Sequence, residues 1–133
     1  MSENLALVRS IYAAWERGDF TSVEWAHPEI ESVAADGAAP GSGVGLAAMA
    51  EGMRDFLSAW ANLRAKPEKY RELDRERVLV FVHHSGRGKT SGFEIGQMRT
   101  KAAVLFHIRE GKVTRLVVYW DRERALSDWG LSE

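Results

Sequence analysis

Apolar residues follow helical spacing in two segments of the first half of the chain. Within residues 3–17 they fall three or four positions apart, which predicts a helix that Ser2 caps and Gly18 ends. The same spacing predicts a longer helix over residues 45–63, whose apolar stripe contains Leu46, Met49, Met53, Phe56, Trp60 and Leu63. Each helix therefore has one face to bury against another layer.

The segment between these two helices carries stop and turn signals. A short helix that includes Trp25 is expected to end at His27, because Pro28 disfavours the helical conformation in the residue before it. A strand is predicted over residues 29–36. The glycine-rich tract that follows is predicted to be a loop as far as Gly45.

The second half of the chain changes to a period of two, which is typical of strands. Strands are predicted over residues 66–73, 78–84, 93–109 and 112–120. Turns are expected at residues 74–77, at the hairpin candidate 86–88 and at 110–111. A last helix over residues 122–129 is capped by Asp121 and closed by Gly130.

This order of elements predicts an α+β fold in a single domain over residues 1–133, with helices covering one face of a curved sheet. The net charge is −1 and the pI about 6.4, which favours neither nucleic acid nor an anionic membrane as a partner. The chain has no cysteine, which excludes disulfides and fits a cytoplasmic location. The N-terminus has no signal-peptide pattern, and no apolar run is long enough to span a membrane.

Three segments together resemble a known family. They are VRSIYAAWERGDF (8–20), SGVGLAAMAEGM (42–53) and VLFHIREGKVTRLVVYWDRERALSDWGL (104–131). The chain is similar to the nuclear transport factor 2-like superfamily, in its SnoaL-like and ketosteroid isomerase-like branch. The resemblance implies a cone-shaped, cystatin-like α+β barrel, in which a curved mixed sheet wraps around the N-terminal helices and a short helix ends the chain. It also implies one deep pocket and a homodimer packed through the outer sheet face, where Leu105, Val117 and Tyr119 lie.

Asp36 is the main candidate for chemistry. By its spacing to the helix start at Gly45, it matches the general base of the ketosteroid isomerases, and its small apolar neighbours suit a sheltered carboxylate. The alternative is that Asp36-Gly37 only begins a turn. The two oxyanion donors of those isomerases correspond to Ile11 and Phe106 here, so steroid-type isomerisation is not expected.

Other titratable residues have competing interpretations. Asp121 is a candidate catalytic acid, as in SnoaL-like cyclases, or the cap of the last helix. His83 and His84 are adjacent on a strand and therefore point to opposite faces, and His84 is the candidate proton carrier in the pocket. His107 is expected on the outer surface. No metal site and no cofactor are predicted.

Aromatic residues either fill the core or line the pocket. The candidates for ligand contact are Tyr12, Trp15, Met53, Trp60, Phe106 and Trp120. The GRGKTS segment (86–91) lacks the spacing and the following helix of a phosphate-binding loop, so it is interpreted as a basic hairpin tip. No aromatic platform for nucleic acid is evident.

The leading hypothesis is a small-molecule-binding protein with an apolar pocket. It is either a cofactor-free isomerase, cyclase, dehydratase or hydrolase that uses Asp36 as general base, or a binder of an apolar, ring-containing metabolite. The competing hypothesis is a non-catalytic dimerisation or ligand-carrier domain. Fold alone does not decide between them.

Overall fold

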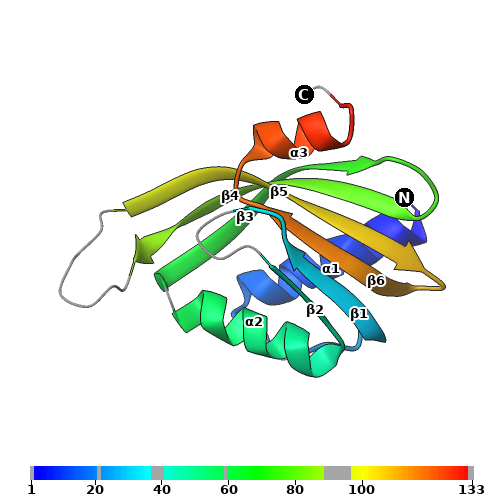
Figure 1. Ribbon diagram of the computed structural model, residues 1–133, viewed down its shortest axis with the longest axis horizontal. Helices are drawn as coiled ribbons and strands as arrows, with labels where there is room; N and C mark the ends of the chain where they lie inside the picture. The colour runs from blue at the N-terminus through cyan, green and yellow to red at the C-terminus, as the bar shows by residue number, and fades with distance from the viewer. Residues whose placement is uncertain (1, 21, 37–40, 59, 89–96, 132–133) are drawn as a thin grey trace.

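A computed structural model describes residues 2–20, 22–36, 41–58, 60–88 and 97–131. It contains three helices and six strands (Figure 1). In chain order these are α1 (Glu3–Glu16), β1 (Ala26–Ala34), β2 (Gly41–Val44), α2 (Leu46–Ser58), β3 (Trp60–Glu72), β4 (Arg77–Gly88), β5 (Gln97–Arg109), β6 (Lys112–Tyr119) and α3 (Arg122–Asp128). The predicted α+β class is confirmed.

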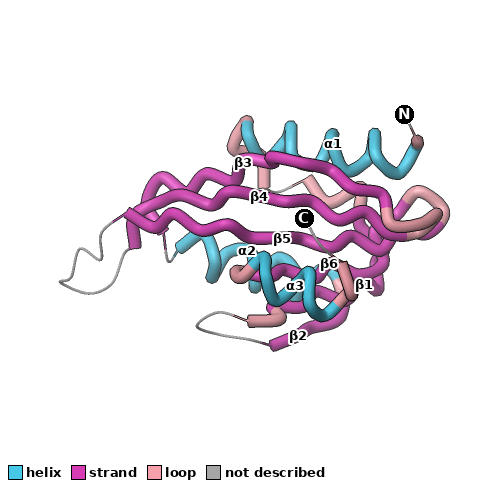
Figure 2. The backbone as a smooth tube through the Cα atoms, turned by 90° about the horizontal axis from the view of Figure 1, so that it is seen from above, coloured by secondary structure: helices cyan, strands magenta, loops and turns pink. Residues whose placement is uncertain are grey.

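The strands form one mixed sheet in the order β2-β1-β6-β5-β4-β3. Only the β1–β6 pair is parallel among these neighbours, and the other four pairs are antiparallel. Figure 2 shows the long strands β3, β4 and β5 running side by side with α1 along β3. The parallel pair matters most for function, because it brings the C-terminal ends of β1 and β6 to the same end of the sheet.

Both faces of the sheet are buried. Alternate residues of β4 show this, because Val78, Val80 and Val82 face the core that includes α1, whereas Leu79 and Phe81 face a second core. The first core contains residues of α1, α2 and the concave face of the sheet, and the second contains residues of α3 and the convex face. Figure 1 shows α3 on the side of the sheet opposite α2.

The helices were expected on one face only, and α3 corrects this expectation. Leu105, Val117 and Tyr119, the residues on which the predicted dimer contact relied, are buried in the same core as Leu126 of α3. A second copy of the chain therefore cannot reach these three side chains while α3 is docked. Homodimerisation remains a prediction that needs another surface.

Two element boundaries in the first half differ from the sequence-based prediction. The short helix around Trp25 is a turn, and β1 starts at Ala26, ahead of Pro28. A strand accepts this proline because the β1–β6 ladder is irregular between Ala26 and Glu31, so the missing N–H interrupts no regular pairing. The glycine-rich tract also supplies an edge strand, β2.

The second helix is shorter than predicted. It ends at Ser58, and Trp60 starts β3 instead of completing the apolar stripe of a helix. The pattern misled because a short apolar segment fits a buried strand as well as a helix. Gly86 to Gly88 continue β4 instead of forming the hairpin turn, and the last three residues of the GRGKTS segment (89–91) lie outside the described residues.

The turn between β5 and β6 is as predicted. Glu110 and Gly111 both have positive φ angles, 52° and 74°, which is the backbone shape that joins two antiparallel strands most tightly. Asp121 caps α3, since its side chain accepts a hydrogen bond from the Glu123 N–H. No helix in the described ranges is long and apolar enough to cross a membrane.

Candidate functional site

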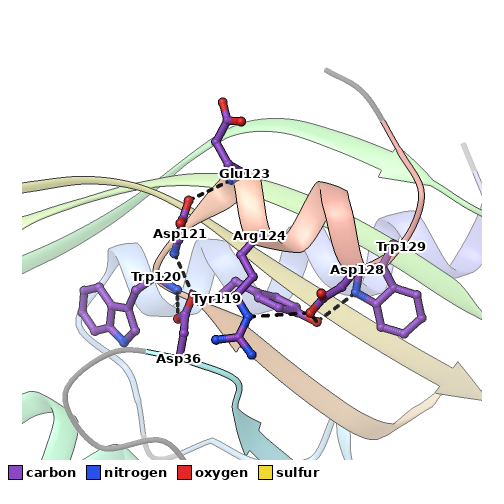
Figure 3. Close-up of polar contacts among 8 residues, drawn as sticks. All are labelled: Asp36, Tyr119, Trp120, Asp121, Glu123, Arg124, Asp128 and Trp129. Atoms are coloured by element: carbon purple, nitrogen blue, oxygen red, sulfur yellow. Dashed lines mark hydrogen bonds and ion pairs between the residues drawn. The ribbon is translucent and has the colours of Figure 1, made fainter.

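Asp36 follows β1 at the point where β6 also ends. One carboxylate oxygen accepts a hydrogen bond from the backbone N–H of Trp120 at 2.6 Å, and the other accepts one from the backbone N–H of Asp121 at 3.2 Å (Figure 3). Just before it, the Ala35 N–H donates to the Val118 carbonyl at 3.0 Å. Asp36 thus extends the β1–β6 pairing past the last ladder residues with its side chain.

This geometry gives Asp36 a task that neither sequence interpretation contained. The carboxylate joins the ends of two strands, so it contributes to the structure whatever its chemical role. Each oxygen still has a second lone pair, because a carboxylate oxygen accepts up to two hydrogen bonds. The turn interpretation depends on Gly37, which lies outside the described residues.

Asp121 has the geometry of a helix cap. Its own carboxylate accepts the Glu123 N–H at 3.0 Å, while its backbone N–H donates to Asp36. The residue is exposed. Two successive hydrogen bonds therefore connect Asp36 to the first turn of α3. The Asp36 carboxylate accepts the Asp121 backbone N–H, and the Asp121 carboxylate accepts the Glu123 backbone N–H, as Figure 3 shows.

His84 lies on the concave face of β4 and is 5% exposed. Burial, and to a smaller extent the neighbouring His83, lower the pKa of His84 to about 4, so the imidazole is neutral at pH 7. Its ring lies 5.2 Å from the ring of Trp120, whose N–H is held by Asp36. The structure thus brings four predicted site residues to one end of the sheet, namely Asp36, His84, Trp120 and Asp121.

Tyr12 lies deeper in the same concave core. Its side chain is 1% exposed and packs edge-on against the rings of Trp15 at 4.9 Å, Phe106 at 5.9 Å and Tyr70 at 6.2 Å. The Tyr12 hydroxyl is buried and has no hydrogen-bond partner among the described residues. Burial, reinforced by Tyr70, raises the pKa of Tyr12 well above its ordinary value, so the group is a hydroxyl donor.

Tyr12 and His84 lie at different positions along the strands of the sheet. Tyr70, a neighbour of Tyr12, pairs with Val80 of β4, and His84 lies four residues further along the same strand. At the usual rise of a strand, the backbone positions of Val80 and His84 are about 13 Å apart. The concave core therefore has an aromatic part around Tyr12 and a more polar part around His84.

The remaining predicted contact residues are not placed in either part. Met53 is half-buried on α2, and Trp60 is the first residue of β3, with a side chain outside the described part. Tyr70 was not among the predicted site residues, because Glu68 and Glu72 two positions away leave no alternating apolar pattern around it.

A surface depression of about 520 Å³ lies away from this interior. It is lined by Ser2, Glu3, Asn4, Glu72, Leu73, Asp74 and Arg75, at the start of α1 and the β3–β4 turn. None of the predicted site residues is among them. Within the described ranges, no group of three or more His, Asp or Glu side chains is arranged to hold a metal ion.

One mixed sheet with α1 and α2 packed on its concave face defines a class of α+β proteins. The chain belongs to the SnoaL-like domain family, whose model matches residues 8–116. No curated protein matches the sequence.

Solved structures share the fold at low sequence identity. An NTF2-like protein of unknown function from Burkholderia pseudomallei is 19% identical, with a TM-score of 0.79 over 96% of this chain and 97% of that one. TerC, co-crystallized with polyporic acid, is 23% identical with a TM-score of 0.75 over the same shares. A putative SnoaL-like polyketide cyclase from Shewanella putrefaciens is 14% identical, with a TM-score of 0.73 over 96% of each chain.

Proposed function

We propose that this protein binds a small, ring-containing molecule in its concave interior and that the Tyr12 hydroxyl donates a hydrogen bond to it. The observation that carries the proposal is the buried Tyr12 hydroxyl without a partner. Leaving such a donor unsatisfied costs about 1–3 kcal/mol. A ligand oxygen that accepts this hydrogen bond removes the cost on binding.

The surroundings of Tyr12 support a ligand with a flat apolar body. The rings of Trp15, Tyr70 and Phe106 pack edge-on around the tyrosine, so a ligand oxygen that reaches its hydroxyl would bring its own ring among aromatic side chains. The SnoaL-like family membership supports a small-molecule-binding domain. The shared fold of TerC, which was crystallized with polyporic acid, fits the same reading.

A pair of probes that differ only in a carbonyl group tests the proposal. 2-Acetylnaphthalene carries the acceptor, and 2-ethylnaphthalene does not. Isothermal titration of the wild-type protein is expected to show tighter binding of the ketone by about tenfold, the value of one hydrogen bond. In Tyr12→Phe this preference disappears while 2-ethylnaphthalene binds as before. Failure of both probes to bind, or an unchanged preference in Tyr12→Phe, overturns the proposal.

In the enzymatic form of this proposal, Asp36 is the general base, without a cofactor. Its position next to Trp120, whose ring packs on His84, supports a role at the polar end of the interior. The substrate would be an apolar molecule reaching from the Tyr12 end to this carboxylate, and the reaction an isomerisation, cyclisation, dehydration or hydrolysis. His84, neutral at pH 7, is the proposed proton carrier.

The carrier form of the proposal has no chemical step. It predicts that Asp36→Asn changes stability but not the affinity for 2-acetylnaphthalene. The enzymatic form predicts, in addition, that the folded Asp36→Asn variant loses turnover of any substrate found by screening by at least about 100-fold. A dimerisation domain with a filled interior would bind neither probe, and size-exclusion chromatography would report a dimer.

A further inference from the structure

His107 lies on the convex face of the sheet, between two cationic residues. In the strand ladders it pairs directly with Arg77 of β4 on one side and with Arg115 of β6 on the other. Side chains of directly paired residues project to the same face and lie close together. Arg77 forms an ion pair with Asp74 at 2.8 Å, and Arg115 forms one with Glu31 at 2.9 Å. Both guanidinium groups therefore stay charged beside the imidazole.

The third neighbour of His107 is Trp129, the residue directly after α3. The two rings lie 6.0 Å apart, and the Arg77 guanidinium lies 5.4 Å from the centre of the same indole. The Trp129 indole N–H donates to the Tyr119 hydroxyl at 3.2 Å, and this hydroxyl donates to Asp128 at 3.1 Å (Figure 3). These contacts fasten the C-terminal end of α3 to the sheet beside His107.

The imidazole is held in its neutral form. The Nε2 atom of His107 is buried and has no hydrogen-bond partner in the part of the chain that the structure describes. Burial lowers the pKa of His107, and Arg115 and Arg77 lower it further. Asp74 and Glu76 act in the opposite direction but do not cancel this effect.

The other charged groups near this contact are already engaged with each other. Glu76 faces Arg109 at 3.7 Å. On α3, Asp128 accepts from Tyr119 and lies 3.9 Å from Arg124. Asp74 and Glu76 act on His107 through their charge, and among the described residues none accepts a hydrogen bond from its Nε2.

We propose that His107 is a proton-sensitive latch for α3. The neutral imidazole packs against Trp129 and holds the helix on the convex face. Once protonated, it repels the guanidinium groups of Arg77 and Arg115 and needs an acceptor that the site lacks, so the C-terminal end of α3 is released.

The sign of the pH dependence follows from the lowered pKa. A histidine that is easier to deprotonate in the folded chain contributes stability above its unfolded pKa of about 6.5. That contribution is lost as the pH falls below this value. Acid pH therefore weakens the packing of His107 against Trp129, and neutral pH favours the docked α3.

Amide hydrogen exchange of the full chain tests the latch. Intrinsic amide exchange slows as the pH falls, so the readout is the protection factor, which corrects for this effect. Between about pH 7.5 and about pH 5, the protection factors of the Ala125 and Trp129 amides are expected to fall by up to about tenfold per pH unit. In His107→Gln, whose side chain stays neutral, this fall is absent. His27→Gln removes a histidine of β1 and serves as the matched control that behaves like wild type. Equal acid responses in His107→Gln and wild type would overturn the proposal.

A measurement on the wild-type protein keeps the test decisive if His107→Gln does not fold. In an NMR titration, the midpoint of the His107 ring is expected to lie below the ordinary histidine pKa of about 6.5, and the Trp129 indole N–H signal to move with that midpoint. A His107 midpoint at or above about 6.5, or an indole signal that does not follow it, contradicts the latch. Neither readout depends on the proposed ligand.

Discussion

The Asp36 carboxylate bonds to backbone N–H groups that lie 84 and 85 residues further along the chain. It is the side chain that closes the end of the parallel β1–β6 pair, where the regular ladder stops at Ala34 and Val118. Any catalytic use of this carboxylate must therefore leave the strand ends in place. This dual task makes simple substitution of Asp36 ambiguous unless stability is measured together with activity.

Asp36→Asn is expected to lower the free energy of unfolding by about 1–3 kcal/mol, because the new amide group faces an N–H that needs an acceptor. Asp121→Asn is the matched control. Asparagine caps helices as well as aspartate does, so this change is expected to cost less than about 0.5 kcal/mol. Urea denaturation of both variants measures the difference. Equal stabilities would show that the Asp36 hydrogen bonds contribute nothing.

The contrast between these two aspartates shows what the sequence can predict at the scale of a residue. The cap at Asp121 depends on residues next to it, and the sequence predicted it correctly. The partners of Asp36 come from the other end of the chain, and only the parallel pairing of β1 and β6 brings them together. The hydroxyl of Tyr12 is a similar case, because a missing partner is a property of the packed core.

At the scale of an element, α3 depends on its contacts. A helix of 7 residues is too short to be stable alone, so its docking must supply the stability. Arg122 is buried at its start and donates to the carbonyls of Ala102 and Val82, both at 3.2 Å, and to Glu68 at 2.7 Å. One side chain thus ties α3 to β3, β4 and β5.

Arg122→Ala is expected to destabilise the protein by about 2–3 kcal/mol, since it removes buried hydrogen bonds and the packing of a long stem. Glu68→Gln removes only the ion pair. The Glu68 side chain is 43% exposed, so this change is expected to cost less than about 1 kcal/mol. Thermal unfolding of both variants compares them. An effect of Glu68→Gln as large as that of Arg122→Ala would show that the bonds from Arg122 to the Ala102 and Val82 carbonyls add nothing to the docking of α3.

Two glycines differ in whether their backbone conformation accepts a side chain. Gly52 lies inside α2 with open space around it, so Gly52→Ala is expected to stabilise the protein by about 0.5–1 kcal/mol. Gly111 also has open space, but its φ of 74° disfavours any side chain. Gly111→Ala is therefore expected to cost about 1–2 kcal/mol. Chemical denaturation of the pair decides, and effects of the same sign would contradict this account.

The elements with long, regular patterns were predicted well, and those with mixed signals were not. The periodicity of α1 and of β4 to β6 appears in the sequence because one face of each element is consistently apolar. The end of α2 was misplaced because Trp60 fits both a helical stripe and a buried strand. The strand β2 was missed because pairing with β1, and not local propensity, makes a strand of a Gly-Ser-Gly-Val segment.

At the scale of the whole molecule, one sheet separates two cores with different tasks. The concave core holds Tyr12 and His84 and is the proposed binding interior. The convex core anchors α3, whose first turn is bonded to Asp36. The sequence shows that the VLVFV run of β4 is apolar on both faces, but not which helix covers which face. That assignment required the packed structure.

The central claim is that the concave interior receives a ring-containing molecule at Tyr12. A crystal structure of the protein soaked with 2-acetylnaphthalene tests it most directly. The account predicts the naphthalene rings among Trp15, Tyr70 and Phe106, with the ketone oxygen about 2.7–3.0 Å from the Tyr12 hydroxyl. Density for the probe elsewhere, with the Tyr12 hydroxyl bonded to a protein group in a filled interior, would contradict the account.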